Sequence, residues 1–168
     1  MTAAAQLEPA EPTLTLAVPL RARSKGSMQP FIDSRGIARV REDNTETKPT
    51  MRVLIDALTA ARVTHPRRRE FPLDCPVELT LTFFYVAPGN AGPLDRPSTV
   101  RTPDIDKAER LVLDCLTQSG VLKDDARVVG VAKTAWYAER DVIQLTVGPA
   151  RGNDGRPLPG AWPSARRR

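Results

Sequence analysis

Four aspartates form two short motifs whose chemistry fits a metal ion. Asp104 and Asp106 stand one residue apart in PDIDKAERLVLDCL, and Asp124 and Asp125 are adjacent in LKDDARVVG. Residues two apart in extended or pre-helical backbone project to the same side, so the first pair can face one point. A hard cation such as Mg²⁺ is bound by carboxylate oxygens together with waters or phosphate oxygens. The first motif therefore predicts a metal site.

A second interpretation makes the same residues helix caps. The tetrapeptide DKAE that begins at Asp106 resembles a capping box, and Asp104 could cap the first turn. Asp124 and Asp125 are adjacent, so their side chains diverge and we expect only one of them to face the first pair. The helix between the motifs is about 20 Å long, so the loop must fold back for the groups to meet. The sequence alone leaves both interpretations open.

Another face of this helix carries charge. Lys107, Arg110 and Asp114 fall together, opposite the apolar stripe. They form either a solvated face with an Arg110–Asp114 pair, or a cationic group beside the metal site that stabilises the scissile phosphate or the leaving group.

The elements that position these residues follow from hydrophobic periodicity. Thr47 is the expected cap of the first helix, with Pro49 in its first turn, and Gly120 is the expected stop of the second. The last two strands are expected to form an antiparallel pair, and the strand over 76–87 to be central. The predicted class is α+β: a mixed sheet with two main helices packed on one face. The predicted strands cover 13–18, 76–87, 126–138 and 140–148, the hairpin 31–40, and the helices 47–63 and 104–117.

Composition divides the chain into a domain and two tails. Residues 1–12 are rich in Ala, Pro and Glu, and residues 148–168 in Gly, Pro and Arg, so both are expected to be disordered, the second as a basic tail. The domain is expected over 13–147. The chain has 25 Lys+Arg against 20 Asp+Glu, a net charge of +5. A basic surface around a small acidic focus is what a metal-dependent nuclease needs.

Several other classes of site find no support in the sequence. Cys75 and Cys115 show no CxxC spacing and are expected to be structural thiols, and His65 stands in a Pro/Arg-rich linker. There is no Gly-rich phosphate loop of the P-loop kind, which disfavours an enzyme that acts on small phosphorylated compounds. With no signal peptide or spanning apolar run, the protein is expected to be soluble and cytoplasmic.

The two motifs together resemble the RusA family of Holliday junction resolvases, the crossover-junction endodeoxyribonucleases of bacteria and their phages. The matching residues are PDIDK, the following LDCL and KDDARVV, supported by SKGSM and KP-x-x-R nearer the N-terminus. The resemblance implies that Asp104, Asp106 and Asp125 are the catalytic, Mg²⁺-binding carboxylates, with Mn²⁺ as a possible substitute. Asp124 would be a neighbour, and Arg110 stands where many members have a catalytic Lys.

The resemblance covers about Thr13 to Val147 and also implies partners. It implies a homodimer in a bacterial cytoplasm, of host or prophage origin, that binds four-way junction DNA and nicks two opposing strands. The alternative is a junction-binding module without catalysis, in which the carboxylates serve as helix caps. The third carboxylate discriminates between the two, because capping explains Asp104 and Asp106 but gives Asp125 no reason to approach them. The residues expected to contact DNA phosphates are Lys25, Lys48, Arg52, Arg101, Lys107 and Lys123.

Overall fold

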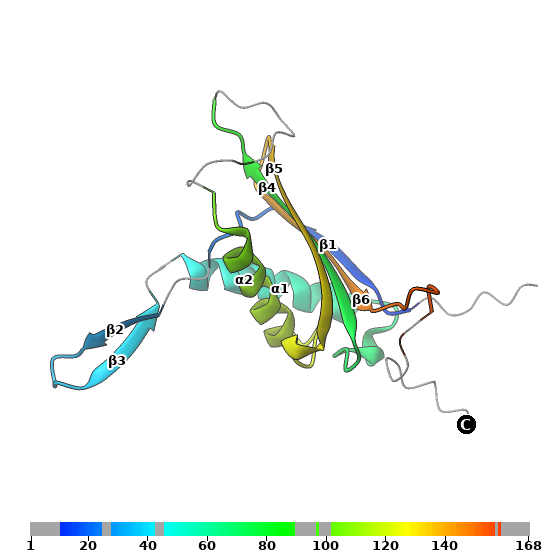
Figure 1. The fold of residues 1–168 in the computed structure, drawn as a ribbon, viewed down its shortest axis with the longest axis horizontal. Helices are drawn as coiled ribbons and strands as arrows, with labels where there is room; N and C mark the ends of the chain where they lie inside the picture. Colours follow the sequence, from blue (N-terminus) through cyan, green and yellow to red (C-terminus); the bar gives the residue numbers. More distant parts are fainter. Residues whose placement is uncertain are drawn as a thin grey trace, which may run out of the picture.

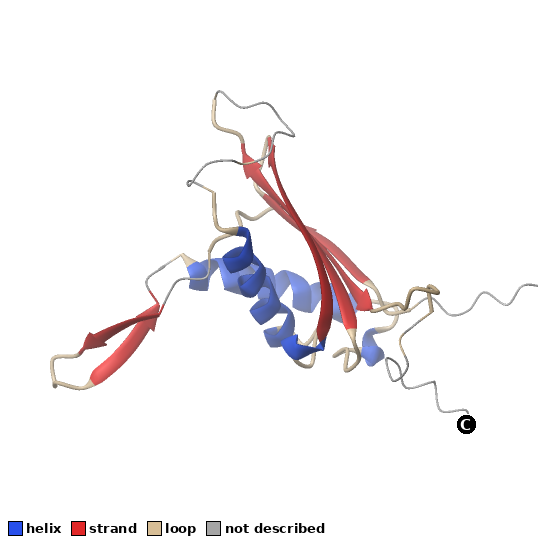
Figure 2. Ribbon diagram, viewed as in Figure 1, coloured by secondary structure: helices blue, strands red, loops and turns tan. Residues whose placement is uncertain are grey.

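The computed structural model describes residues 11–24, 28–42, 46–89, 97, 102–156 and 158. They form a four-stranded mixed sheet and two helices that cover one of its faces (Figure 1, Figure 2). The predicted α+β class is confirmed. The sheet contains β1 (Leu14–Val18), β4 (Val77–Val86), β5 (Val128–Ala138) and β6 (Val142–Pro149); the helices are α1 (Thr47–Thr64) and α2 (Ile105–Gln118). A hairpin of β2 (Met28–Ile32) and β3 (Ala38–Glu42) lies apart, and short 3-10 helices precede β4 (η1, Arg68–Glu70) and β5 (η2, Asp125–Arg127).

Strand β4 is central, as its sequence predicts. The strand order is β1-β6-β4-β5, so β4 has a neighbour on each side. Its alternate residues face the helices, and Leu79, Leu81 and Phe83 are at most 1% exposed. This alternation places one apolar row against α1 and α2 and leaves the other row on the opposite face of the sheet.

The predicted pairing of the last two strands is wrong, because β4 lies between them. β5 pairs parallel with β4, and β6 pairs antiparallel with the other edge of β4. The unit β4–α2–β5 is therefore a parallel crossover, in which the helix carries the chain back to the start of the next strand. Helix α2 packs on the sheet through Ala108, Leu111, Val112, Cys115 and Leu116, which are all buried.

Helix α1 begins at Thr47, as predicted, but its N-cap residue differs from the predicted one. Glu46 is the N-cap residue and no side chain caps the helix there. Thr47 is the first helical residue, and its buried hydroxyl donates instead to the carbonyl oxygen of Ser24, at 3.5 Å. The predicted cap at Thr47 is therefore wrong, whereas Pro49 does lie in the first turn and Gly120 has the positive φ, 71°, expected after α2.

The sheet extends past Val147, where the sequence places the end of the domain. β6 continues to Pro149, and the amide of Ala150 donates to the carbonyl of Pro76 at 2.9 Å. Arg151 forms an ion pair with Glu11, 2.7 Å apart, so residues of the two predicted tails contact each other. Residues 1–10 and 159–168, the outer parts of these tails, lie outside the described residues.

Candidate active site

Asp104 and Asp106 lie together at the start of α2. Asp104 is the N-cap, and its Oδ1 accepts a hydrogen bond from the backbone amide of Asp106 at 3.1 Å. The predicted cap at Asp104 is confirmed, but the capping box that begins at Asp106 is not, because Asp106 is already inside the first turn. Both aspartates are exposed, and the Asp106 side chain retains 67% of its accessible surface. The Asp104 side chain is thus held by the backbone, and both carboxylates are open to a ligand.

Lys133 is a residue of this site that the sequence reasoning missed. It lies in the middle of β5, and its ammonium donates to the carboxylates of Asp106 and Glu109. The hydrogen bond from Lys133 is the main cause that lowers the pKa of Asp106 from its ordinary value of 3.8. The same bond, followed by the one to Glu109, raises the pKa of Lys133. The parallel pairing of β5 with β4 was the missing signal, because it brings the middle of β5 beside the start of α2.

The second acidic motif lies at the other end of α2. Asp124 is the N-cap of η2, and its side chain accepts from the amide of Ala126 at 2.8 Å. Asp125 is the first residue of η2 and is exposed. In a parallel crossover the loop before the helix lies at the carboxyl ends of the strands, and the loop after it at their amino ends. The 14 residues of α2 span about 20 Å, so one chain does not bring Asp125 to Asp104 and Asp106.

The donors at the start of α2 fit Mg²⁺ as part of a coordination set. Among the described residues no group of three or more His, Cys, Asp or Glu side chains could hold a metal ion. Mg²⁺, however, is commonly bound by one or two carboxylates together with waters and substrate phosphates. Asp104 has a second carboxylate oxygen besides the capping Oδ1, and Asp106 is largely exposed. The pair therefore suits a cation that is shared with a phosphate.

The charged face of α2 lies next to this pair. Arg110 is exposed, one turn after Asp106, whereas Lys107 and Asp114 are half-buried. The charge of Arg110 adds to that of Lys133 in lowering the pKa of Asp106. A guanidinium one helical turn from Asp106 can contact a phosphate that approaches the two carboxylates.

The residues expected to contact DNA lie in separate parts of the molecule. Lys48 and Arg52 are exposed, one turn apart on α1. Lys123 is paired with Asp74, with 2.5 Å between Nζ and Oδ2, near the end of α2 that holds Asp124. Lys25 and Arg101 lie outside the described residues. Among the described elements no helix combines the length and the apolar character that crossing a membrane requires.

Comparison with known proteins gives one positive finding. The model of a protein family described as endodeoxyribonuclease RusA matches residues 32–147, more than half of the 168 residues. The match contains both acidic motifs, every element from β3 to β5, and most of β6. A search among curated proteins finds no match.

Proposed function

The chain belongs to the RusA family of Holliday junction endodeoxyribonucleases, and from this premise we propose that it is a Mg²⁺-dependent nuclease that resolves four-way DNA junctions by paired, symmetric nicks. The observation that carries the proposal is the pair Asp104 and Asp106, held two residues apart and exposed at the N-terminus of α2. These carboxylates would hold Mg²⁺, which supplies activation of a water molecule and stabilisation of negative charge on the phosphate.

Asp125 is the third proposed carboxylate, and a second copy of the chain is its proposed source. Asp124 is engaged as the cap of η2, whereas Asp125 is exposed and makes no described contact through its side chain. Within one chain the length of α2 separates Asp125 from Asp104 and Asp106. A two-fold homodimer can place η2 of each copy beside the start of α2 in the other, which gives two equal sites. Two equal sites suit a four-way junction, whose opposing strands are related by a pseudo-two-fold axis.

The remaining residues bind and orient the DNA in this proposal. Arg110, next to the carboxylate pair, would contact the scissile phosphate by paired hydrogen bonds rather than act as a proton donor. Lys107 would contribute positive charge beside it. Lys48, Arg52, Lys123, Lys25 and Arg101 are the proposed contacts to more distant phosphates, which position the junction without reading its sequence.

The test is a cleavage assay on a synthetic four-way junction and on a linear duplex of the same sequence, each with Mg²⁺ and with EDTA. Paired nicks on the junction alone, in Mg²⁺ alone, are the expected result. Tight junction binding with no cleavage in Mg²⁺ or Mn²⁺ would instead favour the junction-binding module. The cap formed by Asp104 and the ion pair between Asp106 and Lys133 give these carboxylates structural roles that suit such a module.

A further inference from the structure

The hairpin of β2 and β3 is an arm that leaves the domain and returns to it at one place. Before the arm, the carbonyl of Ser24 accepts from the hydroxyl of Thr47, which follows the arm, at 3.5 Å. Arg23 and Glu46 form an ion pair across the same point, at 3.6 Å. β2 and β3 contact each other extensively and no other described element to a comparable extent. Figure 1 shows the arm projecting away from the sheet and the two helices.

Exposed apolar side chains flank the polar turn at the tip of the arm, Asp33-Ser34-Arg35-Gly36. Ile32 and Ile37 flank the turn and are 73% and 51% exposed, and Val40 on β3 is 57% exposed. Asp33 holds the turn by accepting from the amide of Ile37 at 3.0 Å and from the guanidinium of Arg39 at 2.5 Å. A two-stranded hairpin is marginally stable by itself. Exposed apolar side chains on both sides of the turn indicate a surface that another molecule covers.

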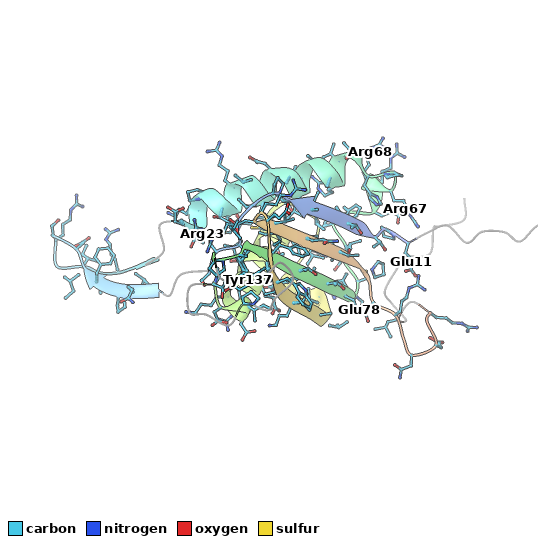
Figure 3. All side chains as sticks on the ribbon, turned by 90° about the horizontal axis from the view of Figure 1, so that it is seen from above. Glu11, Arg23, Arg67, Arg68, Glu78 and Tyr137 are labelled. Carbon is cyan, nitrogen blue, oxygen red and sulfur yellow. The ribbon has the colours of Figure 1, made fainter. Side chains whose placement is uncertain are left out.

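The charge around the arm indicates the chemistry of that molecule. The sequence from Arg21 to Arg52 contains eight Lys or Arg against four Asp or Glu, an excess of four in a chain whose net charge is +5. Arg23 lies at the end of the domain nearest the arm, whereas Arg67 and Arg68 lie at the opposite end (Figure 3). Most of the net positive charge therefore belongs to the arm and its flanks, which suits contact with a polyanion such as DNA.

We propose that the arm enters the branch point of the junction, where Ile32 and Ile37 cover base faces that the strand exchange leaves unstacked. A two-stranded ribbon has the width of a DNA groove, and apolar side chains such as Ile are known to wedge between base steps. The basic residues at the base of the arm hold the phosphates on either side. This inference rests on the proposed function, because it assigns the part of the molecule that distinguishes a junction from a duplex.

The test compares the double variant Ile32→Ser/Ile37→Ser with wild type and with Val63→Ser, a matched control on α1 whose valine is 53% exposed. Binding is measured in EDTA to a junction with 2-aminopurine beside the branch point and to a linear duplex. The arm variant is expected to bind the junction about tenfold more weakly and to lose the rise in 2-aminopurine fluorescence. The affinity of the arm variant for the linear duplex is expected to stay within about twofold of that of wild type. For the control Val63→Ser, the affinities for junction and for duplex are both expected to stay within about twofold of those of wild type.

Two outcomes overturn the proposal, and both differ from failure of the proposed function. Unchanged junction affinity and fluorescence in the arm variant would show that the tip does not enter the branch point, even if wild type cleaves the junction. Loss of binding together with a halved mass in sedimentation equilibrium would show that the arm binds a second copy of the chain. Failure of the proposed function would appear separately, as absence of cleavage by wild type in Mg²⁺.

Discussion

Lys133 in the middle of β5 forms an ion pair with Asp106 in the first turn of α2. The same ammonium contacts Glu109, so it offsets the repulsion between two carboxylates one turn apart. This contact exists because β5 returns parallel to β4 and passes the start of the helix. A divalent cation that binds Asp106 must compete with Lys133 for its oxygen atoms.

Replacing Lys133 by Met should therefore increase the affinity for Mg²⁺. An exposed ion pair contributes at most about 1 kcal/mol, so the expected gain is about two- to fivefold. The measurement is the rise of the thermal midpoint during a Mg²⁺ titration of the full chain. Lys48→Met removes the same charge from an exposed position on α1 and should leave the titration unchanged. Weaker Mg²⁺ binding by Lys133→Met would contradict the competition.

Replacing each proposed metal-binding aspartate by Asn should abolish cleavage of the junction and leave its binding to the protein unchanged. Asp104→Asn, Asp106→Asn and Asp125→Asn are each expected to lower the rate of junction cleavage by about 10²-fold or more, because each removes a charged ligand that would hold Mg²⁺. Asp124→Asn should be milder, since an amide oxygen can still cap η2. Cleavage and gel-shift assays on one junction check this. Equal losses of folding and binding in all four variants would indicate purely structural roles.

The positive charge of Arg110 gives a prediction about contact with the scissile phosphate. Arg110→Ala should lower the cleavage rate about 10- to 100-fold, whereas Arg110→Lys keeps the charge and should stay within about fivefold of wild type. The measurement is single-turnover cleavage with saturating enzyme, so that binding does not limit the rate. A rate for Arg110→Ala equal to that of wild type would remove this residue from the site.

Asp74 gives a prediction about acid stability. Its pKa is lowered from 3.8, mainly by the hydrogen bond from Lys123 and also by the charge of Arg127. The pKa of Asp74 is lower in the folded state than in the unfolded state, so the ionised carboxylate stabilises the fold. This stabilisation is complete above about pH 3.8 and is lost as the pH falls through the pKa of Asp74 in the folded state. Asp74→Asn should thus lower the thermal midpoint more at pH 7 than at pH 2. An equal difference at both pH values would contradict this.

The sequence predicts the elements well because each has a clear period. The alternation in β4 and the apolar stripe of α2 identify a strand and a helix, and Gly120 marks where the helix ends. The pairing of β5 was wrong because its own alternation is equally compatible with parallel and antiparallel neighbours. Only the position of β4 between β5 and β6 decides the direction.

The same limitation affected the site. Local rules place Asp104 at the helix start, and its capping contact follows from them. The contact of Asp106 with Lys133 joins residues 27 positions apart and depends on the parallel crossover. The crossover also carries Asp125 to the far end of α2, which residue spacing along the chain does not reveal.

Mixing two inactive variants tests the shared active site most directly. Asp106→Asn and Asp125→Asn, with different affinity tags, are refolded together and the heterodimer is isolated by sequential purification. If each site combines Asp104 and Asp106 of one copy with Asp125 of the other, one site carries both substitutions and the other carries none. The account predicts that this heterodimer nicks one strand of the junction in Mg²⁺, whereas each homodimer is inactive. A heterodimer as inactive as its parents, beside an active wild type treated in the same way, would contradict the account.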